Sequence, residues 1–245
     1  MKIIGIIPAR YASSRFPGKP LVDIGGKSMI QRVYEQVKGC ASLAEVVVAT
    51  DDQRIEEHVR SFAGNVIMTS SKHESGTDRC AEVISKINGF DVAINIQGDE
   101  PFINPLQIDL LCSLFNDPKT DIGTLVKKID KQEDLVNENT PKVVIGTKQE
   151  ALYFSRQTIP LLRGIPSAEW LRQHNFYKHI GIYGYKTSVL QEITRLPISS
   201  LEKAEALEQL RWLENGYRIR VAETAYDTVA VDRPEDLETI KRAFF

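Results

Sequence analysis

A segment near the start of the chain combines positive charge with small residues. Its residues of interest are Arg10, Ser13, Ser14, Arg15, Gly18 and Lys19. Arginine offers phosphate a planar fork and lysine a mobile point charge, while small residues let backbone N–H groups turn toward an anion. The segment follows the apolar residues 2–7, so we expect a loop after a buried strand that binds the phosphates of a nucleoside triphosphate. It matches neither the dinucleotide-binding nor the P-loop glycine pattern, and a solvated surface loop is the alternative.

Two aspartates follow strand-like stretches far apart in the chain. Asp99 comes after the apolar residues 92–96, and Asp232 comes after residues 228–231. Magnesium prefers oxygen ligands and usually takes one or two carboxylates together with phosphates and water. Two carboxylates at strand ends beside a cationic loop therefore suit a magnesium site. Local roles are the alternative, a turn residue for Asp99 and a helix cap before Pro234 for Asp232.

Residues 70–79 form a polar segment after the third apolar run. Ser75 or Thr77 can cap the helix that starts there, and Arg79 follows in its first turn. Arg156 ends a later predicted strand, where its guanidinium could pair with a carboxylate. These residues are candidates for ligand contacts, with a plain helix cap as the local alternative for Ser75.

Four polar residues of the second half stand out by their position. His179 and Tyr183 are four residues apart in a predicted strand, so their side chains should share one face. Glu208 and Gln209 lie on a predicted helix over residues 201–214, on a side that is ordinarily solvated. A solvated surface is the alternative to any functional role for this pair.

The elements that must position these residues alternate regularly in the first half. Apolar, β-branched runs predict strands, and helical spacing of apolar residues predicts helices between them. The predicted strands cover residues 2–7, 45–49, 65–68 and 92–96, and the predicted helices cover residues 28–37, 52–62, 77–87 and 106–115. This order predicts an α/β fold with a doubly wound, mostly parallel sheet. Such sheets bind ligands at the carboxyl ends of their strands.

The second half is less regular and predicts a smaller inserted subregion. Strands are expected at residues 122–127, 142–146, 152–154, 178–185 and 219–222, a helix at 201–214, and a last helix from Pro234 to Phe244. Residues 155–175 contain Pro160, Gly164 and Pro166 and predict a long loop. No linker-like break occurs, so we expect a single domain over residues 1–245 with a subregion at about 150–215.

Composition excludes several classes of protein. The 245 residues are 42% hydrophobic and 26% charged, which is typical of a globular chain. The 31 basic and 33 acidic residues give a net charge of −2, so we expect no nucleic-acid partner. Three distant cysteines without a C-x-x-C pattern suit a reducing compartment. No apolar run approaches the roughly 18–20 residues of a membrane span, and the apolar start is short for a signal peptide, so a cytoplasmic location is expected.

Five motifs in order carry a resemblance to a known family. They are Pro8-Ala9-Arg10 with Ser13, Arg15 and Pro17-Gly18-Lys19-Pro20, then Gln97-Gly98-Asp99-Glu100-Pro101, Tyr153-Phe154-Ser155-Arg156, His179-Ile180-Gly181-Ile182-Tyr183, and Val231-Asp232-Arg233-Pro234-Glu235-Asp236-Leu237. The first resembles the signature loop of sugar-activating nucleotidyltransferases. Together, from residue 2 to about 242, they closely resemble the 3-deoxy-manno-octulosonate (KDO) cytidylyltransferase family. Ser28 departs from a frequent Pro and Ala230 from a usual Gly, and neither residue bears chemistry.

The resemblance implies a fold like that of nucleotide-sugar transferases and the reaction CTP + KDO → CMP-KDO + diphosphate, which supplies lipopolysaccharide biosynthesis. It implies Mg²⁺ as the cofactor, held by Asp99 and Asp232, and a homodimer. The implied catalytic residues are Arg10, Lys19 and Asp99. The implied nucleotide-binding residues are Pro8, Ala9, Arg10, Ser13, Lys19, Ser75 and Arg79, and the implied sugar-binding residues are Gln97, Arg156, His179, Tyr183, Glu208 and Gln209.

Three other functions stay open at this point. A cytidylyltransferase for a related acidic sugar, such as 8-amino KDO or a sialic-like acid, would differ by a few hydroxyl contacts. A nucleotide-sugar-dependent glycosyltransferase would carry D-x-D after a strand, where this chain has Gln97-Gly98-Asp99-Glu100. A non-catalytic binding protein would tolerate the loss of Asp99.

Overall fold

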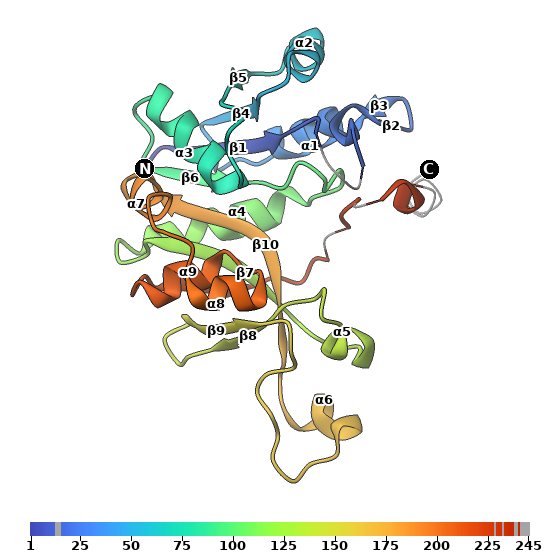
Figure 1. Ribbon diagram of the computed structural model, residues 1–245, viewed down its shortest axis with the longest axis vertical. Helices are drawn as coiled ribbons and strands as arrows, with labels where there is room; N and C mark the ends of the chain where they lie inside the picture. The colour runs from blue at the N-terminus through green and yellow to red at the C-terminus, as the bar shows by residue number, and fades with distance from the viewer. Residues whose placement is uncertain (13–15, 228, 232, 238–239, 241–245) are drawn as a thin grey trace.

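A twisted central sheet organises the chain (Figure 1). The computed structural model describes residues 1–12, 16–227, 229–231, 233–237 and 240. Strands β1 (Ile3–Ala9), β4 (Glu45–Thr50), β5 (Val66–Met68) and β6 (Val92–Asn95) pair in parallel, in the order β5-β4-β1-β6. Their continuous β-branched runs suit strands that are buried on both faces. The predicted parallel half of the sheet is confirmed.

The sheet continues through an antiparallel strand. Strand β10 (Tyr177–Lys186) lies between β6 and β7 (Ile122–Lys128) and is antiparallel to both, and β11 (Ile219–Glu223) pairs in parallel with β7. Strands β8 (Lys142–Ile145) and β9 (Ala151–Ser155) form an antiparallel pair that joins β10 through β8. The second half thus extends the sheet and adds a small antiparallel layer.

Helices cover both faces of the sheet, as a doubly wound fold requires. One core cluster packs α1 (Met29–Lys38), α2 (Gln53–Ser61) and α4 (Pro105–Ser113) on one face. The other packs α3 (Gly76–Lys86), α7 (Thr187–Ile193) and α9 (Gln209–Glu214) on the opposite face. Side chains of β1 alternate between the clusters, with Ile3 and Ile7 in the first and Ile4 and Ile6 in the second.

Short elements complete the described chain. Loop connections contain the 3₁₀ turns η1 (Lys19–Leu21), η2 (Leu114–Asn116) and η3 (Ser167–Glu169), the hairpin β2 (Asp23–Ile24) with β3 (Lys27–Ser28), and the helices α5 (Gln132–Val136), α6 (Trp170–Gln173) and α8 (Ser200–Glu205). The segment between β9 and β10, predicted as a long loop, projects from the molecule and carries α6 near its tip (Figure 1). Within the described part of the chain, no helix has the length and apolarity to cross a bilayer.

Two predicted elements are wrong. The helix expected over residues 201–214 is two helices, α8 and α9, because Ala206 takes a left-handed conformation with φ 51° after the end of α8. Residues 229–231, expected as the end of a strand, are not in a strand. Of the predicted C-terminal helix, residues 234–237 are helical, and most of the remainder lies outside the described residues.

Candidate active site

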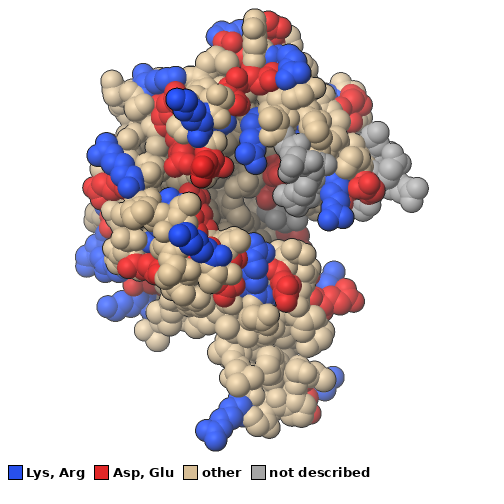
Figure 2. Space-filling view, in the orientation of Figure 1, with Lys and Arg blue, Asp and Glu red and all other residues tan. Residues whose placement is uncertain are grey.

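A pocket of about 230 Å³ lies where β1 and β6 end and α3 begins. Its lining residues are Pro8, Ala9, Arg10, Lys19, Pro20, His73, Glu74, Ser75, Gly76, Arg79, Gln97, Gly98 and Asp99. The pocket lies at the carboxyl ends of parallel strands, where open α/β sheets bind ligands. Figure 2 shows a recess near the middle of this view of the molecule, with acidic and basic side chains along its rim. The pocket brings together eight of the predicted site residues.

A lysine and an aspartate separated by 80 residues meet in this pocket. Lys19 Nζ donates to Asp99 Oδ2 at 2.7 Å and to the carbonyl oxygen of Val231 at 2.8 Å. The N–H of Val231 in turn donates to the carbonyl oxygen of Asp99 at 2.9 Å. The cationic loop, the end of β6 and the C-terminal segment therefore converge. Asp232, the second predicted metal ligand, lies outside the described residues, as does Ser13.

Glycines allow the backbone to come close at the pocket wall. A Cβ at Gly98 would lie 2.6 Å from the carbonyl oxygen of Pro8, a contact that no side chain tolerates. Gly18 has φ 73°, which favours glycine, and its N–H donates to the carbonyl oxygen of Tyr11 at 2.9 Å. These contacts press the β1 loop against the turn after β6, so the residues around Lys19 and Asp99 share one wall.

The opposite side of the pocket is the first turn of α3. Ser75 caps this helix and forms a capping box with Asp78, so the helix cap considered for Ser75 is confirmed. Arg79 is only 4% exposed, and its guanidinium donates to Thr69 Oγ1 at 2.5 Å and lies 3.4 Å from Asp51 Oδ1. A buried, paired guanidinium is a rigid donor, which suits recognition of a polar ligand edge.

Helix α3 also holds the loop at the pocket rim. Glu82 Oε2 accepts from the N–H of Ser70 at 2.8 Å and contacts His73 Nε2, and Glu82 Oε1 pairs with Lys86 at 2.7 Å. Burial acts to raise the pKa of Glu82, but the Lys86, Ser70 and His73 contacts together lower it to about 2. Glu82 is therefore an anion that anchors the loop carrying His73.

The predicted sugar-binding strand brings two rings together. The rings of His179 and Tyr183 lie 5.1 Å apart between centroids, and His179 Nε2 contacts Thr124 Oγ1 at 3.0 Å. Burial lowers the pKa of His179 to about 3, so its imidazole is neutral at ordinary pH. Within the part of the chain that the structure describes, the hydroxyl of Tyr183 is buried without a hydrogen bond of standard geometry. Gln97 Nε2 donates to the carbonyl oxygen of Gly181 at 2.8 Å, which ties the turn after β6 to this strand.

Glu208 and Gln209 are not on a solvated surface, and that interpretation is wrong. Gln209 is 5% exposed, and its Nε2 is buried without a hydrogen-bond partner among the described residues. Glu208 Oε2 accepts from Thr77 Oγ1 at 2.7 Å, and burial raises the pKa of Glu208. Both residues lie directly after the break between α8 and α9, at the start of α9.

The donor set around Asp99 fits a hard divalent cation. Asp99 presents a partly exposed carboxylate, 26% exposed at the side chain, in a pocket that is also lined by the cationic Arg10 and Lys19. Burial, and then the nearby charge of Asp99, raise the pKa of the adjacent Glu100 to about 8. Among described residues, no three histidines, cysteines, aspartates or glutamates gather as a metal-binding group. The set thus suits an ion that takes most of its ligands from phosphates and water.

Known proteins match this chain over nearly its full length. A cytidylyltransferase family model matches residues 4–219. The 3-deoxy-manno-octulosonate cytidylyltransferase of Parabacteroides distasonis is 59% identical over 243 residues, which cover 97% of this chain and 96% of the relative. The protein of the same name from Bacteroides thetaiotaomicron is 57% identical over 242 residues, 97% of this chain and 96% of the relative. This chain belongs to the 3-deoxy-manno-octulosonate cytidylyltransferase family.

Solved structures agree with this family. A CMP:2-keto-3-deoxy-manno-octonic acid synthetase complexed with CTP superposes with a TM-score of 0.92 at 46% identity and covers 99% of this chain and 98% of its own. A 4-diphosphocytidyl-2C-methyl-D-erythritol synthase from Anaerococcus prevotii, 12% identical with a TM-score of 0.62 and coverage of 99% and 98%, shares the fold. The predicted nucleotide-sugar transferase-like fold is confirmed.

Within this KDO cytidylyltransferase family member, Arg156 is more constrained than the sequence suggested. Its guanidinium donates to the carbonyl oxygens of Glu205 at 2.6 Å, Glu138 at 3.0 Å and Ala206 at 3.2 Å. Lys142, fully buried, donates from Nζ to the carbonyl oxygens of Arg156 at 2.6 Å and Asn137 at 2.8 Å. Among the described residues, three of the five guanidinium N–H groups therefore donate to backbone carbonyl oxygens, and the other two are available to a ligand.

Sequence reasoning missed Lys142 and Thr77 among the residues that support this site. Lys142 occupies a strand between apolar residues, where a lysine is ordinarily exposed. Its fully buried position signals a structural hydrogen-bonding role, but sequence alone does not reveal burial. Thr77 has the spacing of a helix cap, which hides its contact with a residue 131 positions away.

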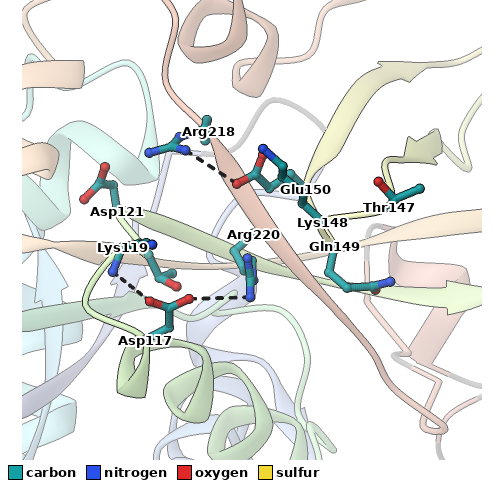
Figure 3. Close-up of a pocket in the computed structure, with 10 residues that line it drawn as sticks. Asp117, Lys119, Asp121, Thr147, Lys148, Gln149, Glu150, Arg218 and Arg220 are labelled. Carbon is teal, nitrogen blue, oxygen red and sulfur yellow. Dashed lines mark hydrogen bonds and ion pairs between the residues drawn. The ribbon is translucent and has the colours of Figure 1, made fainter.

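The KDO cytidylyltransferase chain has another hollow away from these residues. It measures about 490 Å³ and is lined by Asp117, Lys119, Thr120, Asp121, Thr147, Lys148, Gln149, Glu150, Arg218 and Arg220 (Figure 3). Arg220 pairs with Asp117 at 3.5 Å and Arg218 with Glu150 at 3.9 Å. Its charges are of both signs and partly paired, and none of the predicted site residues that the structure describes lines it.

Proposed function

We propose that this chain transfers CMP from CTP to the anomeric hydroxyl of KDO and releases diphosphate. The observation that carries the proposal is the meeting of Lys19 and Asp99, 2.7 Å apart, in a pocket whose other wall is Ser75 and Arg79. The 46% identical synthetase whose structure holds CTP supports the choice of nucleotide. The relatives named for 3-deoxy-manno-octulosonate support the choice of sugar acid.

Nucleotidyl transfer depends on positioning and charge neutralisation. The KDO hydroxyl attacks the α-phosphorus in line and loses its proton to water, while the bond from this phosphorus to the bridging oxygen of diphosphate breaks and diphosphate leaves. Arg10 and Lys19 neutralise charge on the α-phosphate and the departing diphosphate. No side chain is assigned as a general base.

The proposal divides the remaining residues between the two substrates. Pro8, Ala9, Arg10, Ser13, Lys19, Ser75 and Arg79 contact CTP, and Ser75 and Arg79 face the base. Gln97, Arg156, His179, Tyr183, Glu208 and Gln209 contact KDO, with the free N–H groups of Arg156 directed at the sugar carboxylate. A neutral His179, which has a pKa of about 3, suits contacts with sugar hydroxyls.

Magnesium is the proposed cofactor, with Asp99 and Asp232 as its protein ligands. When bound, the ion supplies positive charge to the phosphates and to the attacking hydroxyl. Lys19 keeps the Asp99 carboxylate oriented toward the pocket through its 2.7 Å contact. The same proposal includes a cytoplasmic homodimer that serves lipopolysaccharide biosynthesis.

Diphosphate release tests the proposal directly. Purified protein with magnesium is assayed with CTP, UTP, ATP or GTP against KDO, 8-amino KDO or N-acetylneuraminate. We expect turnover with CTP and KDO at least about a hundredfold above other combinations, since discrimination rests on buried polar contacts. Preference for 8-amino KDO or N-acetylneuraminate would assign the chain to another acidic sugar, and no turnover with any pair would refute the proposal.

A further inference from the structure

A hydrogen bond from Thr77 to Glu208 joins the two ends of the candidate site. Thr77, 2% exposed, donates from Oγ1 to Glu208 Oε2 at 2.7 Å. Thr77 is the second residue of α3, directly after Ser75 and Gly76, which line the pocket proposed for CTP. Glu208 immediately precedes α9, on the side proposed for the sugar. The bond therefore connects the helix that receives the base with the carboxylate that receives the sugar.

The surroundings of Glu208 contain unsatisfied polar atoms. Among described residues, Tyr183 Oη and Gln209 Nε2 are buried without a hydrogen bond of standard geometry, and Tyr185 Oη is buried beside the Thr77 hydroxyl. Burial raises the pKa of both tyrosines, and the charge of Glu208 raises them further, which places its carboxylate beside these rings. Buried polar groups are ordinarily paired, so this group of atoms is suited to a polyhydroxylated ligand.

We propose that Thr77 is a positioning residue for the sugar substrate. Its hydroxyl holds the Glu208 carboxylate in the orientation that accepts hydrogen bonds from sugar hydroxyls. Because Thr77 belongs to α3, the base-binding turn and the sugar-binding carboxylate are fixed relative to each other. This inference rests on the proposed function and adds a residue that has no contact with either substrate.

The groups around Glu208 determine whether loss of the Thr77 hydroxyl raises or lowers the pKa of Glu208. Burial raises the pKa of Glu208, and so does Asp78 on α3, whereas hydrogen bonds from Thr77 and Ser75 and the charge of Arg211 on α9 lower it. Tyr183 and Tyr185 of β10 and Cys80 of α3 are neutral neighbours at ordinary pH, with raised pKa values. Loss of the Thr77 hydroxyl therefore raises the pKa of Glu208 further.

Substitution of Thr77 by valine removes the hydroxyl and keeps the β-branched shape and helix propensity. For Thr77→Val we expect the KM for KDO to rise about tenfold, since a hydrogen bond to a charged group is lost, and the KM for CTP to change less than about twofold. The acidic limb of the pH profile of kcat/KM for KDO should move upward in pH. Thr77→Ser, which keeps the hydroxyl, should restore wild-type values in both measurements.

Glu208→Gln, alone and combined with Thr77→Val, gives a double-mutant cycle for this contact. We expect it to raise the KM for KDO at least as much as Thr77→Val, and the double variant to be no worse than Glu208→Gln alone, because one interaction is removed. Equal effects of Thr77→Val on both substrates, a Thr77→Ser variant as impaired as Thr77→Val, or additive effects would overturn the inference. An unchanged KM for KDO in Glu208→Gln, with CTP- and KDO-dependent turnover intact, would overturn it and leave the proposed function standing.

Thr77→Ala serves as the second hydroxyl-free variant, and its melting temperature is measured as a control for folding. Wild-type kinetics in Thr77→Ala would also refute the inference.

Discussion

The pair of Lys19 and Asp99 joins segments that are far apart in the chain, yet it contributes little to folding. Its side chains are 15% and 26% exposed, and a partly exposed ion pair is worth roughly 0–1 kcal/mol. In the proposed reaction the same pair faces phosphates and a cation, where charge matters far more than in water. Its contribution to catalysis should therefore greatly exceed its contribution to stability.

Asp99→Asn tests whether this ion pair matters more for catalysis than for stability. We expect it to abolish diphosphate release from CTP and KDO, because the amide cannot replace a carboxylate as a ligand for a divalent cation. The melting temperature should change by no more than about 2–4 °C. The control is Glu35→Gln, which removes the carboxylate of an exposed ion pair with Lys27, 2.5 Å long, outside the pocket. Full turnover by Asp99→Asn would refute the role proposed for Asp99.

Arg156→Ala should separate the two substrates. Loss of the guanidinium removes the proposed partner of the sugar carboxylate, so the KM for KDO should rise at least about tenfold more than the KM for CTP. It also removes donors to the carbonyl oxygens of Glu205, Glu138 and Ala206, so a lower melting temperature is expected too. Steady-state kinetics at varied KDO and at varied CTP provide the measurement. Equal increases in both KM values would contradict the carboxylate contact.

Among the elements, α3 has the most connections to the candidate site. Its first turn is capped by Ser75, lines the pocket and reaches Glu208 through Thr77, while its second turn anchors the pocket rim through Glu82. The helix is held on the sheet by its buried Cys80 and Val83. One rigid helix thus fixes groups that would otherwise lie on separate loops.

Glu82→Gln should change how stability depends on pH. The folded-state pKa of Glu82, about 2, lies below its ordinary value of 4.5, so its ionised form stabilises the fold above about pH 4.5. This contribution is lost as the pH falls toward 2. Glu82→Gln should therefore be less stable than wild type by on the order of 1–2 kcal/mol at pH 6, and the difference should vanish near pH 2. Urea unfolding from pH 2 to 7 measures it.

The matched control for that measurement is Glu56→Gln. Glu56 also pairs with a basic residue one helical turn away, Arg60, at 2.8 Å, but on α2 and away from the rim loop. An exposed pair of this kind contributes about 0.3–0.5 kcal/mol. If both variants show the same small, pH-independent loss, Glu82 has no special role in anchoring the loop.

The projecting segment between β9 and β10 shares a small separate core with the region of α5. Ile129, Leu135 and Phe176 are buried in this core, with Leu162, Trp170 and Leu171 packed against them. The rings of Trp170 and Phe176 stack with centroids 6.0 Å apart. At the same time Leu161 is 72% and Leu152 62% exposed, which is unusual for leucine side chains. These features support the proposed homodimer.

Sedimentation equilibrium should therefore give about twice the chain mass of 27.6 kDa at micromolar protein. We expect Leu161→Asp to weaken the association, because a buried carboxylate at an apolar contact is costly. Leu106→Asp, at a leucine that is 56% exposed on α4, is the control and should leave the mass unchanged. A mass of one chain for the wild-type protein would contradict the homodimer.

Local sequence was sufficient for most strands and helices of the first half. Residues 46–48 are three consecutive valines followed by the polar residues 50–53, a local pattern that favours a strand ending there. The turn that holds Asp99 follows from the end of β6, and the capping of α3 follows from Ser75 and Asp78 three residues apart. Such features depend on nearby residues alone.

The break between α8 and α9 could not be predicted, because it depends on contacts across the molecule. Residues 201–214 have helical spacing throughout, but carbonyl oxygens of Glu205 and Ala206 accept from Arg156, and Arg211 of α9 pairs with Glu202 of α8 at 2.5 Å. These contacts stabilise the left-handed Ala206 and turn Glu208 inward. Tertiary hydrogen bonds here outweigh helix propensity, which is worth less than about 1 kcal/mol per residue.

Strand β10 also shows which features the local sequence predicts and which depend on pairing with other strands. Strand periodicity places His179 and Tyr183 on one face, but a regular strand separates residues four apart by about 13 Å. Their rings lie 5.1 Å apart because the register with β7 shifts between Ile180 and Tyr183.

The amino-acid sequence by itself therefore determined which residues form strands and which polar groups follow them. Pairing between distant segments decided that Lys19 meets Asp99 and Thr77 meets Glu208, since both contacts join groups that are near only in the folded state.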